Sequence, residues 1–252
     1  MQHLAVARQG SGSPLVLVHG YFGGAEHWRG ERDALSDRYE VIAPALAGFG
    51  ESAEITAPDT IAGNAELVWQ ALDAEGIDRI ALLGHSMGGM VVQEMVAQQP
   101  ARVKRLVLYG TGPVGLLPGR FETLDQSRAR IKRDGLEATL RRVAATWFVE
   151  GEAAPGFQTC IEVGRLATEQ AALAALRAWE TWDGRANLAR IAVPTLIIWG
   201  DRDRSYPRAQ IDALLAGIPD TRLALVEGCA HAVHLEAPAK FHAALRDFLA
   251  EG

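Results

Sequence analysis

Ser86 is the residue whose setting most suggests chemistry, because it stands at the centre of the pentapeptide Gly84-His85-Ser86-Met87-Gly88. An apolar run precedes this pentapeptide and apolar side chains at helical spacing follow it, which predicts a strand, a tight turn and a helix. The two glycines suit such a turn, since side chains there would collide with neighbouring backbone. A serine hydroxyl is a weak nucleophile alone, so the chemistry also requires a base and a carboxylate.

Candidates for the base and the carboxylate lie late in the chain. Asp201 and Asp203 follow an apolar run at 193–199, and His231 follows another at 222–226. His231 would accept the serine proton and later deliver it to the leaving group, while an aspartate would hold the imidazole tautomer. His234 is the competing histidine, and we expect it to begin the final helix.

The elements that must position these residues alternate along the chain. Buried strands are predicted at 15–18, 39–43, 79–83, 103–109, 193–199 and 222–226, and residues 3–8 have the pattern of a half-exposed antiparallel strand. Helices are predicted at 25–35, 60–75, 207–215 and 237–249 and directly after Ser86. This order favours an α/β fold with a mostly parallel central sheet, helices on both faces and ligands at the carboxyl ends of the strands.

Residues 113–188 interrupt the alternation. They contain no convincing buried strand, but helical patterns occur at 121–133, 136–148, 158–167 and 169–179. We therefore predict an inserted helical cap, or lid, at 113–188 and a core made of 1–112 and 189–252.

Composition narrows the possible partners. The chain has 252 residues and a formal net charge of -6, with no basic run that would favour nucleic acid. It lacks a secretory-type start and an apolar stretch of about 18 residues, so we expect a cytoplasmic protein without a membrane partner. The two cysteines, Cys160 and Cys229, lie far apart in sequence and suit a reducing compartment without a disulfide. The oligomeric state is left open.

Four motifs together resemble those of the α/β-hydrolase fold family over nearly the whole chain. They are His19-Gly20-Tyr21, Gly84-His85-Ser86-Met87-Gly88, Gly200-Asp201-Arg202-Asp203 and Gly228-Cys229-Ala230-His231, each after a predicted strand. The order serine, aspartate, histidine is also that of the family.

The resemblance assigns roles to individual residues. The family spacing of a glycine, two residues and an aspartate selects Asp203 over Asp201 as the triad acid. It implies an oxyanion hole formed by the backbone N–H groups of Met87 and Tyr21, with Phe22 as the alternative to Tyr21. It implies no cofactor and no metal.

Two features depart from the family pattern. Ala45 stands where the loop after the second parallel strand usually has an aspartate, and the family's first antiparallel strand is missing. Neither departure touches the three triad positions.

The sequences of these motifs and the predicted cap are similar to those of 3-oxoadipate enol-lactonases and small bacterial carboxylesterases. We therefore expect a serine hydrolase acting on a small carboxylic ester or lactone. The nearest alternative is a carbon-carbon hydrolase of the meta-cleavage-product type, whose loop resembles the stretch from His19 to Trp28. Perhydrolase and hydroxynitrile lyase chemistry also use this constellation, and a ligand-sensing protein with little or no catalysis is the alternative from another class.

Aromatic residues are the candidates for an apolar substrate pocket. The candidates are Phe22, Trp147, Phe148, Trp179, Trp182 and Tyr206, and the further cap aromatics Phe121 and Phe157 are expected in the pocket or the cap core. Cap arginines could contact a substrate carboxylate but more often form a solvated face; they are Arg128, Arg130, Arg133, Arg141 and Arg142.

Overall fold

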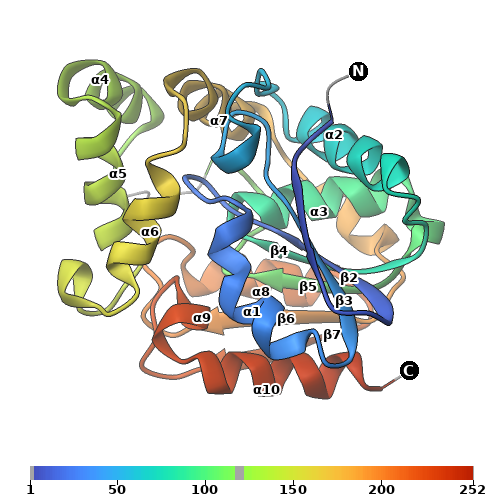
Figure 1. Cartoon of the computed structure of the whole chain (residues 1–252). Coiled ribbons are helices and arrows are strands. Elements are labelled where there is room, and N and C mark those ends of the chain that lie inside the picture. Colours follow the sequence, from blue (N-terminus) through green and yellow to red (C-terminus); the bar gives the residue numbers. More distant parts are fainter. Residues whose placement is uncertain (1–2, 117–121, 252) are drawn as a thin grey trace.

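One twisted sheet lies at the centre of the molecule (Figure 1). The computed structural model describes residues 3–116 and 122–251, and within them seven strands pair in the order β1-β3-β2-β4-β5-β6-β7. Strand β1 is antiparallel to β3, and the other neighbours are parallel. The strands are β1 Val6–Gln9, β2 Ser13–Val18, β3 Tyr39–Pro44, β4 Ile80–His85, β5 Val103–Tyr109, β6 Thr195–Gly200 and β7 Thr221–Val226.

Helices cover both faces of this sheet, because alternate side chains of the central strands point to opposite faces. Val16 and Val18 of β2 belong to one apolar cluster, whereas Leu15 and Leu17 belong to the other. The first cluster is covered by α2 Ile61–Ala74, α3 Met87–Gln98 and α8 Arg208–Gly217, and the second by α1 Arg29–Leu35 and α10 Pro238–Leu249.

The chain between β5 and β6 is helical in its described part. Figure 1 shows α4, α5 and α6 grouped at one end of the molecule. Helix α4 packs on α5 and α7, α5 on α6, and α7 also on α2. Apolar side chains of this segment continue the cluster on the α2 and α3 face. The helices are α4 Leu124–Asp134, α5 Leu136–Ala145, α6 Phe157–Gly164 and α7 Glu169–Thr181.

The predicted mostly parallel sheet with flanking helices is confirmed, and most boundaries differ by a few residues. The segment predicted as a helix from 25 begins as a 3-10 turn, Ala25–Trp28, before α1. The start predicted at Phe121 lies outside the described residues; α4 begins at Leu124, where Thr123 and Gln126 form a reciprocal capping box.

The expectation that His234 begins the final helix is wrong. His234 lies in a separate short helix, α9 Val233–Glu236, and α10 begins at Pro238. Ala237 between them has an extended φ of -140°, as a residue before proline prefers. Proline then suits the first position of α10, where no N–H donor is needed.

In the described part of the chain, no helix combines the length and apolar character that crossing a membrane requires. Both cysteines are free thiols, and each is buried.

Candidate active site

Ser86 occupies a strained turn between β4 and α3. Its φ of 56° and ψ of -119° are unusual for a residue with a side chain. A methyl group at Gly84 would lie 2.3 Å from the carbonyl oxygen of Gly88, and one at Gly88 would lie 2.3 Å from that of Val18. Both positions therefore need glycine, and the turn holds Ser86 at the head of the helix.

Hydrogen bonds from β5 and the loop after it hold the backbone of Ser86. Its N–H donates to the carbonyl of Tyr109 at 2.9 Å, and the Thr111 hydroxyl donates to its carbonyl at 2.8 Å. The Ser86 residue itself is only partly buried, so its hydroxyl can be reached from the cavity described below.

His231 and Asp203 form a buried pair. The imidazole Nδ1 lies 2.9 Å from Asp203 Oδ2, and neither side chain is more than 1% exposed. The other carboxylate oxygen, Oδ1, accepts the N–H groups of Ser205 at 2.7 Å and Tyr206 at 3.1 Å. A carboxylate only accepts hydrogen bonds, so an ionised Asp203 places the imidazole proton on Nδ1 and leaves Nε2 as the basic atom. The Tyr206 ring stacks on the imidazole at 5.7 Å.

The end of β5 brings His231 and the turn at Ser86 together. His85, next to Ser86, has its ring 4.5 Å from that of His231 and its Nε2 3.2 Å from the His231 carbonyl oxygen. Gly110 follows Tyr109, the acceptor for Ser86 N–H, and a methyl group on Gly110 would lie 3.1 Å from His231 Nδ1. Ser86 and His231 therefore lie against two consecutive residues, Tyr109 and Gly110.

The competing aspartate and histidine have other partners. Asp201 Oδ1 accepts the N–H of Gly228 at 2.6 Å, which ties together the loops after β6 and β7. His234 is buried, and the Tyr109 hydroxyl oxygen lies 2.9 Å from His234 Nδ1 and 3.1 Å from the backbone nitrogen of His234. The structure thus brings Asp203, and not Asp201, to His231.

The loop after β2 lies against Ser86. A methyl group at Gly20 would come within 2.9 Å of Ser86 Cβ, so this glycine allows the close approach. The peptide that follows Gly20 carries the N–H of Tyr21, while Phe22 has a φ of 55° and is fully buried. Met87 is the first residue of α3, and its N–H has no acceptor within the helix.

A neutral histidine fixes this loop. His19 Nε2 accepts the N–H of Leu46 at 2.8 Å, which leaves Nδ1 to donate to the Gly20 carbonyl at 2.8 Å. Burial lowers the pKa of His19 to about 4. Burial likewise lowers the pKa of His27 to about 3 and holds those of His85 and His234 well below their usual range. These four rings are therefore neutral at neutral pH.

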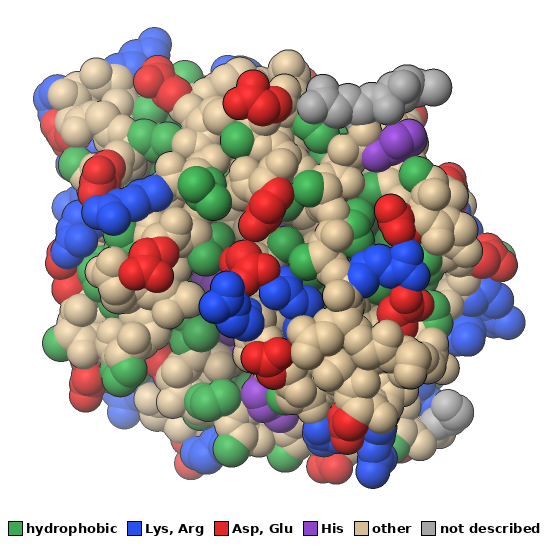
Figure 2. All heavy atoms as spheres, in the orientation of Figure 1, with side chains coloured by type: hydrophobic (Ala, Val, Ile, Leu, Met, Phe, Trp, Pro, Cys, Tyr) green, Lys and Arg blue, Asp and Glu red, His purple; other side chains and the backbone are tan. Residues whose placement is uncertain are grey.

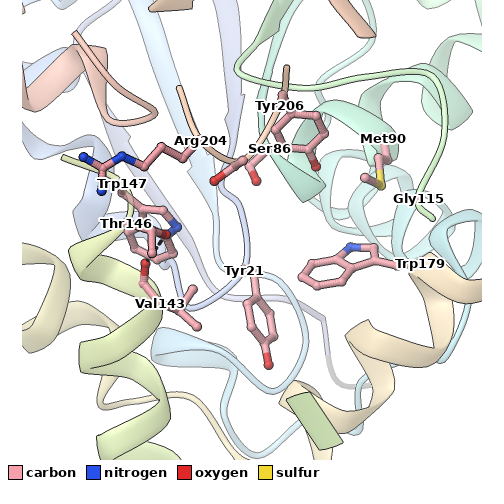
Figure 3. A pocket seen from close by; sticks show the side chains of 11 residues that line it. Tyr21, Ser86, Met90, Gly115, Val143, Thr146, Trp147, Trp179, Arg204 and Tyr206 are labelled. Carbon is pink, nitrogen blue, oxygen red and sulfur yellow. Dashed lines mark hydrogen bonds between the residues drawn. The ribbon is translucent and has the colours of Figure 1, made fainter. Parts of the chain in front are cut away.

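Ser86 opens into a cavity of about 50 Å³, room for roughly four water molecules (Figure 3). The predicted pocket residues Trp147, Trp179 and Tyr206 line it together with Tyr21. Sequence reasoning missed six other lining residues, which are Met90, Gly115, Val143, Thr146, Arg204 and Ser205. Arg204 and Ser205 lie between Asp203 and Tyr206 in sequence, so their position between two predicted site residues could have identified them as lining residues.

Three of the residues predicted to form the pocket are not among the described residues that line this cavity. Phe22 and Phe148 are fully buried in the apolar cluster. Trp182 lines a separate groove with Asp183 and donates its indole N–H to Glu94 at 2.8 Å. Of the further cap aromatics, Phe157 is buried and Phe121 lies outside the described residues.

The cap arginines considered from sequence all have carboxylate partners. Their ion pairs are Arg128 with Glu180 and Asp125, Arg130 with Glu122 and Asp134, Arg133 with Asp134, Arg141 with Glu152, and Arg142 with Glu122. Over residues 3–116 and 122–251, no group of three or more His, Cys, Asp or Glu side chains could hold a metal ion.

The chain belongs to the α/β-hydrolase fold family, whose model matches residues 13–238. It is 32% identical over 250 residues to the putative carbamate hydrolase RutD of Azorhizobium caulinodans, covering 96% of this chain and 93% of that protein. It is 28% identical over 257 residues to a 2-hydroxy-6-oxo-6-phenylhexa-2,4-dienoate hydrolase of Burkholderia cepacia, with 96% and 90% covered. The enol-lactonase of Burkholderia xenovorans LB400 has the same fold, with a TM-score of 0.88, 24% identity, and 98% and 96% covered. The protein is therefore a hydrolase of the α/β-hydrolase type.

Proposed function

We propose that this protein hydrolyses small carboxylic esters or lactones through an acyl-enzyme on Ser86. The observation that carries the proposal is the buried His231–Asp203 pair, 2.9 Å apart, beside a strained serine that opens into a small cavity. A buried carboxylate that fixes the imidazole tautomer has a clear chemical use next to a nucleophile. The fold shared with an enol-lactonase is consistent with this chemistry.

In the proposed first half-reaction, Ser86 Oγ attacks the substrate carbonyl carbon while His231 Nε2 accepts its proton. The carbonyl oxygen becomes an oxyanion, which the backbone N–H groups of Tyr21 and Met87 stabilise. The C–O bond to the alcohol then breaks, and His231 returns the proton to the leaving oxygen. Water, deprotonated by the same imidazole, cleaves the acyl-enzyme and restores Ser86.

The segment 113–188 acts as the cap in this proposal. Its residues Val143, Thr146, Trp147 and Trp179 line the cavity that contains Ser86. The small cavity volume favours short acyl groups, because each added methylene needs room in a wall of large side chains.

A substrate panel tests the proposal. We expect turnover of p-nitrophenyl acetate and of a small lactone, with rates that fall as the acyl chain lengthens, and no turnover by Ser86→Ala. Activity retained by Ser86→Ala would contradict the nucleophile assignment. Ligand binding without turnover of any substrate would favour the sensing alternative.

A carbamate is the second candidate substrate, favoured by the 32% identity to the putative carbamate hydrolase RutD. Its carbonyl can be attacked in the same way, with an amine or ammonia as the leaving group. The identity to the Burkholderia cepacia hydrolase keeps carbon-carbon cleavage of vinylogous diketones as a third. Both compounds belong in the panel, and turnover of either one alone would replace the ester and lactone assignment.

A further inference from the structure

Arg204 provides a positive charge in the wall of the cavity that contains Ser86. The other lining residues carry no side-chain charge, so no carboxylate within the described residues neutralises this charge from the wall. In Figure 3 the Arg204 side chain extends from the loop after β6. The lining residues are Tyr21, Ser86, Met90, Gly115, Val143, Thr146, Trp147, Trp179, Arg204, Ser205 and Tyr206.

Arg204 differs from its neighbouring arginines in its partners. Arg202 lies 3.6 Å from Asp201, and Arg208 lies 2.7 Å from Asp212. Arg204 forms no ion pair or side-chain hydrogen bond within residues 3–116 and 122–251. Its guanidinium donors are therefore not used by another side chain of the described residues.

The backbone of Arg204 is held by the same loop that carries Asp203. The N–H groups of Ser205 and Tyr206 both donate to Asp203 Oδ1, so the turn containing Arg204 is fixed around that carboxylate. Because Asp203 contacts His231, this turn is attached to the catalytic constellation itself. The backbone of Arg204 therefore has a fixed place next to the His231–Asp203 pair.

We propose that Arg204 selects substrates that carry a carboxylate a few carbon atoms from the cleaved ester or lactone carbonyl. This inference rests on the proposed ester or lactone hydrolysis and names its substrate class. A planar guanidinium can donate two parallel hydrogen bonds to a carboxylate, which suits arginine to recognise this group. A half-ester of a C4 or C5 dicarboxylic acid is a simple member of this substrate class.

Two nearly isosteric esters test the inference. Monoethyl glutarate carries a carboxylate where ethyl 5-oxohexanoate carries a methyl ketone, and ethanol release measures both. We expect the wild type to prefer the glutarate by about tenfold in kcat/KM, mainly through KM, because Arg204 is exposed and its ion pair is partly screened. Arg204→Gln should remove this preference, and Arg204→Lys should keep part of it.

Arg202→Gln is the matched control, since Arg202 is an exposed cation of the same loop outside the cavity lining. It should leave the ratio of the two kcat/KM values unchanged. A wild-type enzyme without a preference, or a preference that survives in Arg204→Gln, would overturn the inference while leaving ester hydrolysis intact.

Binding separates this inference from the proposed function. Calorimetry with the Ser86→Ala variant should give a lower Kd for monoethyl glutarate than for ethyl 5-oxohexanoate, and adding Arg204→Gln should remove the difference. If the wild type hydrolyses neither ester but this binding difference is found, the proposed function fails and Arg204 remains the anion-binding group. Equal Kd values for the two compounds in Ser86→Ala would refute the role of Arg204 regardless of turnover.

Discussion

Replacing Asp203 by asparagine should disable the imidazole base through its tautomer. Asp203 Oδ1 accepts two backbone N–H groups, and Oδ2 faces His231 Nδ1. An asparagine keeps these two backbone bonds only if its oxygen takes the place of Oδ1, which turns its NH₂ group toward His231. The opposite orientation would leave two N–H donors facing an NH₂ group, at a cost of about 1–3 kcal/mol for the buried one, that of Tyr206.

The favoured orientation of the amide reverses the imidazole tautomer. Because the NH₂ group donates to Nδ1, the proton of a neutral His231 moves to Nε2, which then cannot accept the Ser86 proton. We expect kcat to fall by about 10⁴-fold, equivalent to about 5.4 kcal/mol of activation free energy. Hydrolysis of p-nitrophenyl acetate at pH 7.5 measures the loss, and urea unfolding checks that the variant is folded.

Asp201→Asn is the matched control for this experiment. Asp201 uses one oxygen to accept the N–H of Gly228, and an asparagine oxygen can accept the same bond. We expect kcat within about twofold of the wild type. The reasoning is refuted if Asp203→Asn retains more than about a tenth of the activity, or if Asp201→Asn is the variant that loses it.

Two further predictions concern stability, and urea unfolding measures both. Gly88→Ala should lower the free energy of unfolding by at least about 3 kcal/mol, because its methyl group would lie 2.3 Å from the Val18 carbonyl oxygen. Gly30→Ala in α1 should instead raise the free energy of unfolding by about 0.5–1 kcal/mol, since no atom lies within 4 Å of the new methyl group. Burial lowers the pKa of His19 from 6.5 to about 4. The neutral ring therefore contributes its full share to the free energy of unfolding above pH 6.5, and about 3 kcal/mol of that free energy should be lost as the pH falls from 6.5 through 4. A free energy of unfolding that stays constant between pH 6.5 and 4 would contradict the second prediction, and equal effects of the two alanines would contradict the first.

The sheet could be predicted from sequence because its central strands are covered on both faces. Such strands are nearly continuous apolar runs, and all seven residues of β5 were predicted from one of them. The turn at Ser86 was also predictable, since only glycine fits at 84 and 88. The break between α9 and α10 was missed, although Pro238 is a signal for the start of a helix.

The composition of the cavity wall could not be predicted, because it depends on how the helices between β5 and β6 pack. Trp147 and Phe148 are adjacent after the end of α5, yet Trp147 lines the cavity and Phe148 is fully buried. The helix predicted at 136–148 ends at Ala145 in the structure, so its period could not distinguish the two side chains that follow. The same limit applies to Arg204, which has no carboxylate partner among the described residues, because this property depends on the folded chain.

Labelling with a fluorophosphonate probe tests the central claim, the nucleophilic role of Ser86, most directly. The probe phosphonylates an activated serine without the need for a known substrate, and peptide mass spectrometry identifies the residue that reacts. We expect the wild type to be labelled on Ser86, Ser86→Ala to remain unlabelled, and Ser205→Ala, which removes the other serine in the cavity lining, to be labelled normally. An unlabelled wild type, or an equally labelled Ser86→Ala, would contradict the account.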